Sequence, residues 1–207
     1  MTKITVVYYS ATGSTYQLAD AVAEGARSAG AEVRLRKTPE TATPTAIAAN
    51  PAWQQHVEAT RHIETATPED LEWADGFVFG TPTRFGLPAG QMKLFIDGLG
   101  GLWSKGKLQD KAASVFGGAG NLHGGQEATL LALQNAFYHW GSIIVPVGYT
   151  DPTLYAAGGN PYGVSFTHVR GEPQPESTLA AARYQGERIA RFAGILADSR
   201  ASAAAVG

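Results

Sequence analysis

The segment from Ser10 to Thr15 is the first stretch whose residue types could bind a ligand. It reads Ser-Ala-Thr-Gly-Ser-Thr, with four hydroxyl side chains and one glycine between an apolar, β-branched run and a helical pattern. Free N–H groups and the dipole at the start of a helix favour an anion such as a phosphate. The segment contains no lysine or arginine. A hydroxyl-rich turn is also an ordinary helix cap, so its composition leaves both interpretations open.

Two later loops, each after an apolar run, carry the remaining candidate groups. The first loop contains Pro82, Thr83, Arg84 and Phe85. The second loop is glycine-rich and contains Gly118, Ala119, Gly120, Asn121, Leu122 and His123. In open α/β sheets ligands bind beyond the carboxyl ends of the strands, so these loops and the segment 10–15 are expected to share one site. A tight turn would equally explain the glycines, and a solvated position would explain the arginine.

The elements that must position these loops follow from the hydrophobic pattern. Runs that are apolar or alternate in polarity predict five strands, at residues 3–9, 32–36, 76–80, 112–116 and 142–146. Between them, apolar residues recur at helical spacing, as in 18–26 and 127–140. Strands that alternate with helices predict a doubly wound α/β fold with a five-stranded parallel sheet and helices on both faces.

The chain length predicts a single domain, residues 1–198, because 207 residues suit one hydrophobic core. Residues 38–66 contain three prolines and are interpreted as an insertion after the second strand, where only 53–63 could hold a helix. The insertion is expected at the sheet edge, away from the candidate loops. The alanine-rich residues 199–207 are expected to form a disordered tail.

Charge and composition exclude several classes of partner. Sixteen Lys and Arg against eighteen Asp and Glu give a formal net charge of −2, which provides no basic field for nucleic acid. No apolar run approaches the roughly 20 residues of a membrane span, so membrane insertion is not expected. Zero cysteines suit a reducing compartment, and we expect a cytoplasmic protein. The spacing of His56, Glu58, His62 and Glu64 matches no familiar metal site, so no metal is expected.

The motifs of this chain resemble those of a known family. The run from Val6 to Ala19 matches every fixed position of the flavodoxin phosphate-loop signature. Further motifs are similar to those of the WrbA-type NAD(P)H:quinone oxidoreductases of the flavodoxin-like superfamily, at 80–86, 90–93, 100–103, 113–116, 124–127, 145–149, 161–163 and 182–186. The resemblance covers about residues 3–195.

The resemblance implies a flavodoxin-like fold with strand order 2-1-3-4-5 and a bound FMN. It assigns the FMN phosphate to Ser10, Ala11, Thr12, Gly13, Ser14 and Thr15. It places the loop 82–85 beside the isoalloxazine ring and the loop 118–123 at the polar edge of that ring. Glycines in the latter loop would let backbone N–H groups approach an edge that becomes electron-rich on reduction.

Two further site residues are implied by the resemblance alone. His139 aligns with a cofactor-binding histidine that faces the flavin, and Trp103 aligns with an aromatic residue on the substrate side. Taken alone, each is more typical of a packed helix residue. The family usually has an aromatic residue, associated with the nicotinamide, where this chain has Thr12, so that contact is in question here.

The resemblance also implies a homotetramer in which neighbouring subunits help to wall the flavin pocket. Five apolar or aromatic residues are more than one domain face would readily hide, which is compatible with buried subunit contacts. These residues are Phe85, Leu99, Leu102, Trp103 and Phe137.

The function that the resemblance implies is transfer of two electrons from NADH or NADPH, through FMN, to quinones, which become hydroquinones. The alternative is a flavodoxin-type electron carrier without turnover of its own. A third interpretation is a relative that binds no flavin, because fold alone does not define function.

Overall fold

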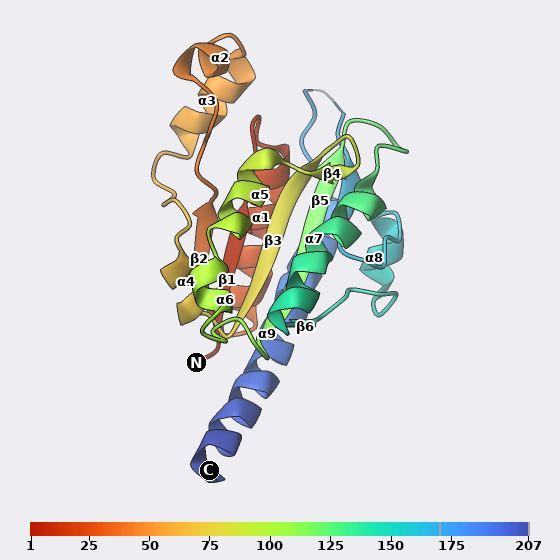
Figure 1. Cartoon of the computed structure of the whole chain (residues 1–207). Helices are drawn as coiled ribbons and strands as arrows, with labels where there is room; N and C mark the ends of the chain where they lie inside the picture. The colour runs from red at the N-terminus through yellow and green to blue at the C-terminus, as the bar shows by residue number, and fades with distance from the viewer. Residues whose placement is uncertain (170, 207) are drawn as a thin grey trace.

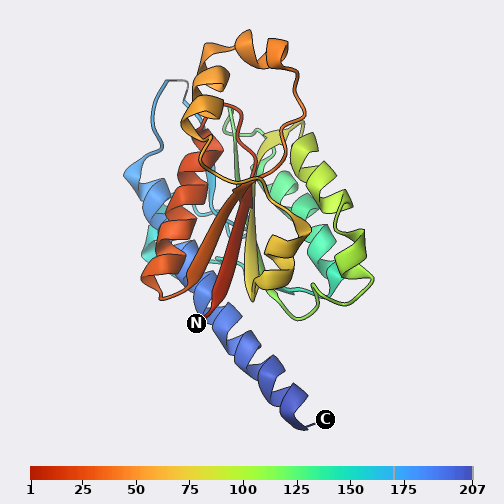
Figure 2. The ribbon, with the colours of Figure 1, turned by 90° about the vertical axis from the view of Figure 1, so that its left-hand side faces the viewer.

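A computed structural model describes residues 1–169 and 171–206 of the chain. Its centre is a sheet between two helical layers (Figures 1 and 2). Five parallel strands form the main path of the sheet, in the spatial order β2 (Glu32–Lys37), β1 (Lys3–Tyr8), β3 (Gly76–Arg84), β5 (Ala112–Ala119) and β6 (Ile143–Ile144). The fold is therefore α/β and flavodoxin-like, with its switch point between β1 and β3.

Two short strands make the sheet seven-stranded, so the expected number of five is wrong. β4 (Leu87–Pro88) returns antiparallel to the end of β3. β7 (Ser165–Thr167) runs parallel to β5 and pairs with residues 117–119. β6 pairs only with the first two residues of β5, which leaves the far end of that strand open for β7. Gly118 and Ala119 were expected in the loop, but they continue the strand.

Helices cover both faces of the sheet. On one face lie α1 (Ser14–Ser28) and α9 (Glu176–Val206), with α8 (Pro152–Ala156) beside α9. On the other face lie α5 (Gly90–Asp97), α6 (Gly100–Trp103) and α7 (Gln126–Trp140) (Figure 2). α4 (Pro68–Trp73) leads into β3 and begins with a capping box formed by Thr67 and Asp70.

Each face of the sheet has its own core. Under α1 and α9 the core is built mostly of aliphatic and small residues, which include Ile4, Val6, Leu18, Val22 and Ile189. Under α5 and α7 it is aromatic, and Phe77 packs edge-on against Phe137 with ring centroids 5.4 Å apart. β1 contributes buried residues to both cores, as expected for a strand that is covered on both faces.

The insertion holds two short helices, α2 (Pro44–Ala48) and α3 (Pro51–Ala59), and projects beyond the carboxyl ends of the strands (Figure 1). Each helix has proline in its first turn and a capping side chain, Thr43 for α2 and Asn50 for α3. The helix that was expected within residues 53–63 therefore begins two residues earlier, at Pro51, and ends at Ala59, before residues 60–63.

The last helix departs from the expected disordered tail. α9 continues through Val206 and projects below the sheet (Figure 1), and Gly207 lies outside the described residues. Arg200 anchors this extension by donating to the carbonyl of Asp110 and the carboxylate of Asp75. Among the described residues, no helix combines the length and apolar character that crossing a membrane would require.

Candidate functional site

The segment from Ser10 to Gly13 forms a tight turn at the start of α1. Gly13 has φ +97°, a left-handed conformation that favours glycine, and its N–H donates to Ser10 Oγ at 3.0 Å. Within the described residues, no side chain caps the helix. The first N–H groups of α1 are therefore free for an anion, as the composition of the segment allows.

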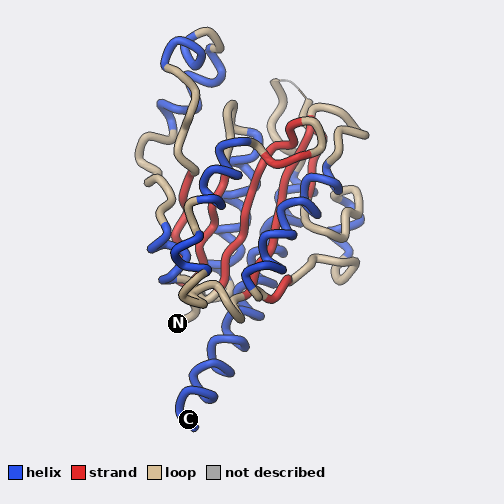
Figure 3. The backbone as a smooth tube through the Cα atoms, viewed as in Figure 1, coloured by secondary structure: helices blue, strands red, loops and turns tan. Residues whose placement is uncertain are grey.

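A cavity of about 130 Å³ lies at the carboxyl edge of the sheet, where loops gather around the ends of β1, β3 and β5 (Figure 3). All three predicted loops contribute to its lining. The predicted residues that line it are Ser10, Ala11, Thr12, Ser14, Thr15, Pro82, Thr83, Arg84, Gly118, Ala119 and Gly120. Thr15 also lines this cavity. It is only 2% exposed, because its helix packs on the sheet.

The loop after β3 is a hairpin turn held at the rim of the cavity. Thr83 Oγ1 lies 2.6 Å from Thr129 Oγ1 and accepts a hydrogen bond from the N–H of Gly86. Phe85 has φ +54° and a fully exposed side chain. A bulky residue in the left-handed region is strained by about 1–3 kcal/mol, and such strain is often found at binding sites.

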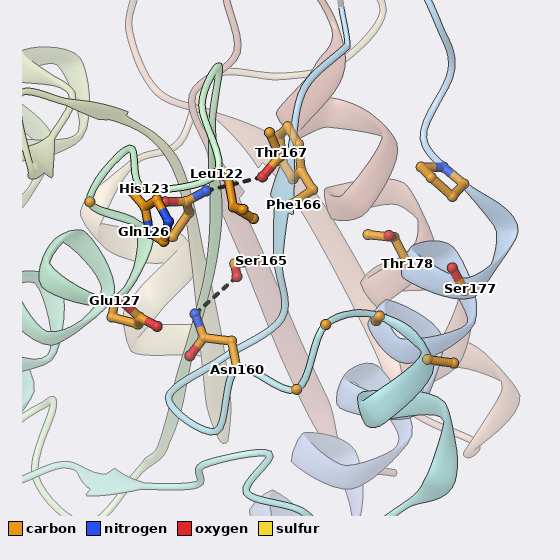
Figure 4. Close-up of a pocket in the computed structure, with 16 residues that line it drawn as sticks. Leu122, His123, Gln126, Glu127, Asn160, Ser165, Phe166, Thr167, Ser177 and Thr178 are labelled. Atoms are coloured by element: carbon orange, nitrogen blue, oxygen red, sulfur yellow. Dashed lines mark hydrogen bonds between the residues drawn. The ribbon is translucent and has the colours of Figure 1, made fainter.

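The glycine-rich loop divides between two cavities. A Cβ at Gly118 would lie 2.3 Å from the ring of Phe166, so packing of β7 requires this glycine, whereas Gly120 has open space around it. Leu122 and His123 instead line a second cavity of about 630 Å³ between the first turns of α7 and α9 (Figure 4).

Three other predicted residues do not line the first cavity. Gly13 acts through its backbone, the ring of Phe85 points into solvent, and the carbonyl of Asn121 accepts from Gln126 Nε2 at 2.9 Å.

Two lining residues, Phe166 and His168, were missed by sequence reasoning. The N–H of His168 donates to the carbonyl of Ala119 at 2.7 Å, and its Nδ1 lies 3.0 Å from Ser14 Oγ. Both residues belong to a segment that carries no local strand signal long enough to be noticed. Only the pairing of β7 with β5 brings them to the site.

Trp103 and His139 lie together but far from this cavity. Trp103 Nε1 donates to the carbonyl of His139 at 3.0 Å. α7 runs antiparallel to β5, so it begins beside the cavity and ends where β5 begins. There, the N–H of Asp110 donates a hydrogen bond to the carbonyl of Gly141. The eight residues of β5 separate the two ends by roughly 25 Å. The expectation that His139 binds the cofactor is therefore not met within a single chain.

The insertion contacts the segment 10–15, which we call the phosphate-type loop. This contact is contrary to the expectation that the insertion lies away from the candidate loops. His56 of α3 packs against Tyr16, with ring centroids 5.6 Å apart, and its Nδ1 would lie 3.4 Å from a Cβ at Gly13. Burial lowers the pKa of His56, and the nearby Lys37 lowers it further. A neutral imidazole thus supports the turn from behind.

A second contact between the insertion and the site passes through Glu40. Its carboxylate accepts hydrogen bonds from Tyr9, Trp53 and Gln91 at 3.1–3.3 Å. Burial raises the pKa of Tyr9, and the Glu40 carboxylate raises it further, so the phenol stays neutral and donates. This network joins β1, the insertion and α5 at the carboxyl edge of the sheet.

The lining of the first cavity fits the phosphate monoester of a cofactor such as FMN. It provides hydroxyls, a free helix N-terminus and two basic side chains, Arg84 and His168, and its described residues include no carboxylate. In the ranges 1–169 and 171–206, no three His, Asp or Glu side chains are placed to hold a metal ion.

An open sheet with an anion-binding turn after its first strand and a cavity at its switch point defines the flavodoxin-like class of flavin-binding proteins. Residues 2–151 match the family described as NADPH-dependent FMN reductase. The chain belongs to this family, and it is a flavin oxidoreductase with FMN as cofactor and NAD(P)H as electron donor.

Individual relatives agree with this assignment. The chain is 48% identical to a protein of Deinococcus radiodurans named NAD(P)H dehydrogenase (quinone), over 90% of this chain and 92% of that one. It is 44% identical to a protein of the same name from Geotalea daltonii, over 92% and 96%. The crystal structure of a flavodoxin, WrbA-like protein from Agrobacterium tumefaciens matches with a TM-score of 0.67 and 27% identity, over 93% of this chain and 98% of that one.

Proposed function

We propose that this protein transfers two electrons from NADH or NADPH to quinones and releases hydroquinones. The observation that carries the proposal is the shared cavity of the segment 10–15, the turn 82–84 and the loop 118–120. The names of the relatives from Deinococcus radiodurans and Geotalea daltonii support a quinone as the acceptor. The proposal places the enzyme in the cytoplasm, with NAD(P)H as a diffusing substrate.

Each part of the cavity has a separate task in this proposal. The hydroxyls of Ser10 and Thr15 and the first N–H groups of α1 hold the phosphate of FMN. Thr83 and Arg84 border the ring, and the open backbone at Gly120 donates toward its polar edge. A bound FMN would supply the redox chemistry of this site, as acceptor of a hydride from NAD(P)H and donor of two electrons to the quinone.

The remaining task of the chain is to position the electron donor and the electron acceptor. Hydride transfer needs the reacting atoms about 3–3.5 Å apart, so donor and acceptor occupy the same open face in turn, in a ping-pong scheme. The hairpin turn at Arg84 and Phe85 forms the exposed rim of that face. No side chain of the cavity needs to act as a general acid or base.

A homotetramer would complete the site. Trp103 is 55% exposed at the opposite end of its own chain, so only a neighbouring subunit could bring it and His139 to the flavin. Exposed apolar side chains also lie along β4, α5, α6 and α7, namely Leu87, Leu94, Trp103, Leu131 and Tyr138. Such a surface is typical of an interface.

The apolar residues that first suggested subunit contacts prove to be a mixed set. Leu99, Leu102 and Phe137 are buried in the aromatic core of the chain itself, so they provide no argument for an interface. Phe85 and Trp103 are exposed, and the case for a tetramer therefore rests on them and on the surface described above.

The visible spectrum and a steady-state assay test the proposed function together. The purified chain, alone or mixed with FMN, should absorb as a flavoprotein and oxidise NADH in the presence of benzoquinone. A flavodoxin-type carrier would bind FMN without this turnover. A chain that FMN cannot titrate would restore the interpretation of a relative without flavin.

A further inference from the structure

Of the basic side chains in the described lining of the first cavity, His168 is the one that forms a hydrogen bond with the segment 10–15. We propose that it is a positioning residue for the FMN phosphate, which it serves by orienting the hydroxyl of Ser14. This inference rests on the proposed placement of the phosphate at residues 10–15. The observation behind it is the 3.0 Å distance between His168 Nδ1 and Ser14 Oγ.

The backbone around His168 is fixed by contacts that do not involve the loop. Its N–H donates to the carbonyl of Ala119, and the preceding strand β7 pairs with β5 in register. The ring of Phe166 occupies the space left by the missing side chain of Gly118. The imidazole is thus held half-buried at the wall of the cavity before any ligand arrives.

The phosphate of FMN carries a negative charge that the loop itself does not balance. Segment 10–15 has no lysine or arginine. Of the two basic residues in the described lining, Arg84 is exposed and donates to the carbonyl of Thr83 on its own turn. His168 is the one of these two that contacts the loop, so it is the basic side chain placed to act on a phosphate bound there.

The hydrogen bond between His168 and Ser14 can run in two directions. If Nδ1 accepts from the hydroxyl, the serine proton is occupied and cannot reach a phosphate. If Nδ1–H donates to Ser14 Oγ, the serine proton is free to donate to a phosphate oxygen. An anion in the cavity favours the second arrangement, and the imidazole then holds Ser14 as a donor.

The other histidine near this loop has a different environment. His56 packs behind Gly13 and Tyr16, lies outside the lining of the cavity and has Lys37 beside it. Burial lowers its pKa, which favours a neutral ring that supports the turn. Of these two histidines, only His168 is therefore predicted to affect phosphate binding from the cavity side.

Paired titrations with FMN and riboflavin isolate the phosphate, because the two ligands differ only in that group. The full chain is freed of flavin by dialysis, and quenching of flavin fluorescence gives each dissociation constant. His168→Ala should weaken FMN about tenfold and leave riboflavin within about twofold. His168→Asn keeps a donor near the position of Nδ1 and should recover most of the loss. His62→Ala, an exposed histidine outside the cavity, is the matched control and should match the wild type.

A double-mutant cycle tests whether His168 acts on the phosphate through Ser14. Ser14→Ala should weaken FMN, and in that background His168→Ala should add little further loss. Fully additive losses would overturn the positioning role.

Other outcomes separate the inference from the proposed function. Unchanged FMN affinity in His168→Ala, or an equal loss of FMN and riboflavin, would also overturn the inference. Equal affinities of the wild-type chain for the two ligands would instead overturn the placement of the phosphate at residues 10–15.

Discussion

Complementation between two inactive variants would show whether one flavin site uses two subunits. Ser10→Glu places a carboxylate in the phosphate-type loop, where a unit charge about 4 Å from the phosphate costs about 4 kcal/mol, enough to remove most FMN binding. Trp103→Ala removes the aromatic side chain at the far end of the chain, should keep FMN, and should lower kcat/KM for the quinone. Each variant alone is expected to be nearly inactive or strongly impaired.

The expected magnitude follows from the roughly 25 Å between the cavity and Trp103. No rearrangement within a folded domain closes that gap. In the proposed homotetramer, an intact site therefore combines the loop of one subunit with the tryptophan of another. When equal amounts of the two variants are mixed randomly, about half of the loops and half of the tryptophans are intact. About one quarter of the wild-type sites should therefore regain full kcat/KM.

The assay measures NADH oxidation with benzoquinone after the variants are unfolded together and refolded, so that subunits exchange. Variants that are refolded separately and then combined on ice serve as the control, because their subunits stay unmixed. Activity of the mixed sample equal to the sum of the separate samples would refute the shared site. A strictly monomeric mass with full activity at micromolar concentration would refute it independently.

Three further predictions concern single residues. Thr15→Val should weaken FMN by about 1–3 kcal/mol and spare riboflavin, if the buried hydroxyl bonds the phosphate, and fluorescence titration measures both. Gly186→Ala should lower the free energy of unfolding by more than about 2 kcal/mol, because its Cβ would lie 2.0 Å from the carbonyl of Val22 in α1. Gly194→Ala on the same helix would meet only the rotatable hydroxyl of Thr2, so urea unfolding should show little loss. Burial, aided by Arg200, lowers the pKa of Lys111 to about 8. Since the unfolded chain keeps this proton up to about pH 10.4, stability should rise by about 2 kcal/mol between pH 8 and pH 10, and this rise should be absent in Lys111→Met.

Local signals in the sequence were sufficient for the first loop and its helix. The hydroxyls at 10–15 and the apolar spacing that begins at Leu18 depend on neighbours along the chain, and the structure places them at the start of α1 as expected. The apolar strands of the main sheet could be predicted for the same reason, because burial on both faces leaves a continuous apolar run.

The tertiary structure alone decided which distant segments complete the site. His168 and Phe166 reach the cavity because the short β6 leaves this edge of β5 unpaired at its far end, where β7 pairs instead. The three residues of β7 form too short a pattern to predict a strand. The same dependence on tertiary structure holds for His56, whose position beside Gly13 depends on how the insertion packs beyond the carboxyl ends of the strands.

Residue types also do not specify which end of the sheet a helical residue will lie beside. The resemblance assigned Trp103 and His139 to the flavin site, but α7 begins at the cavity and carries His139 to the opposite end of the sheet. The sequence by itself thus determined the class of fold and the position of the hydroxyl-rich turn 10–15 at the start of α1, because both depend on short-range patterns. Which residues share one cavity depends on strand pairing and helix direction, and these are decided only when the whole chain packs.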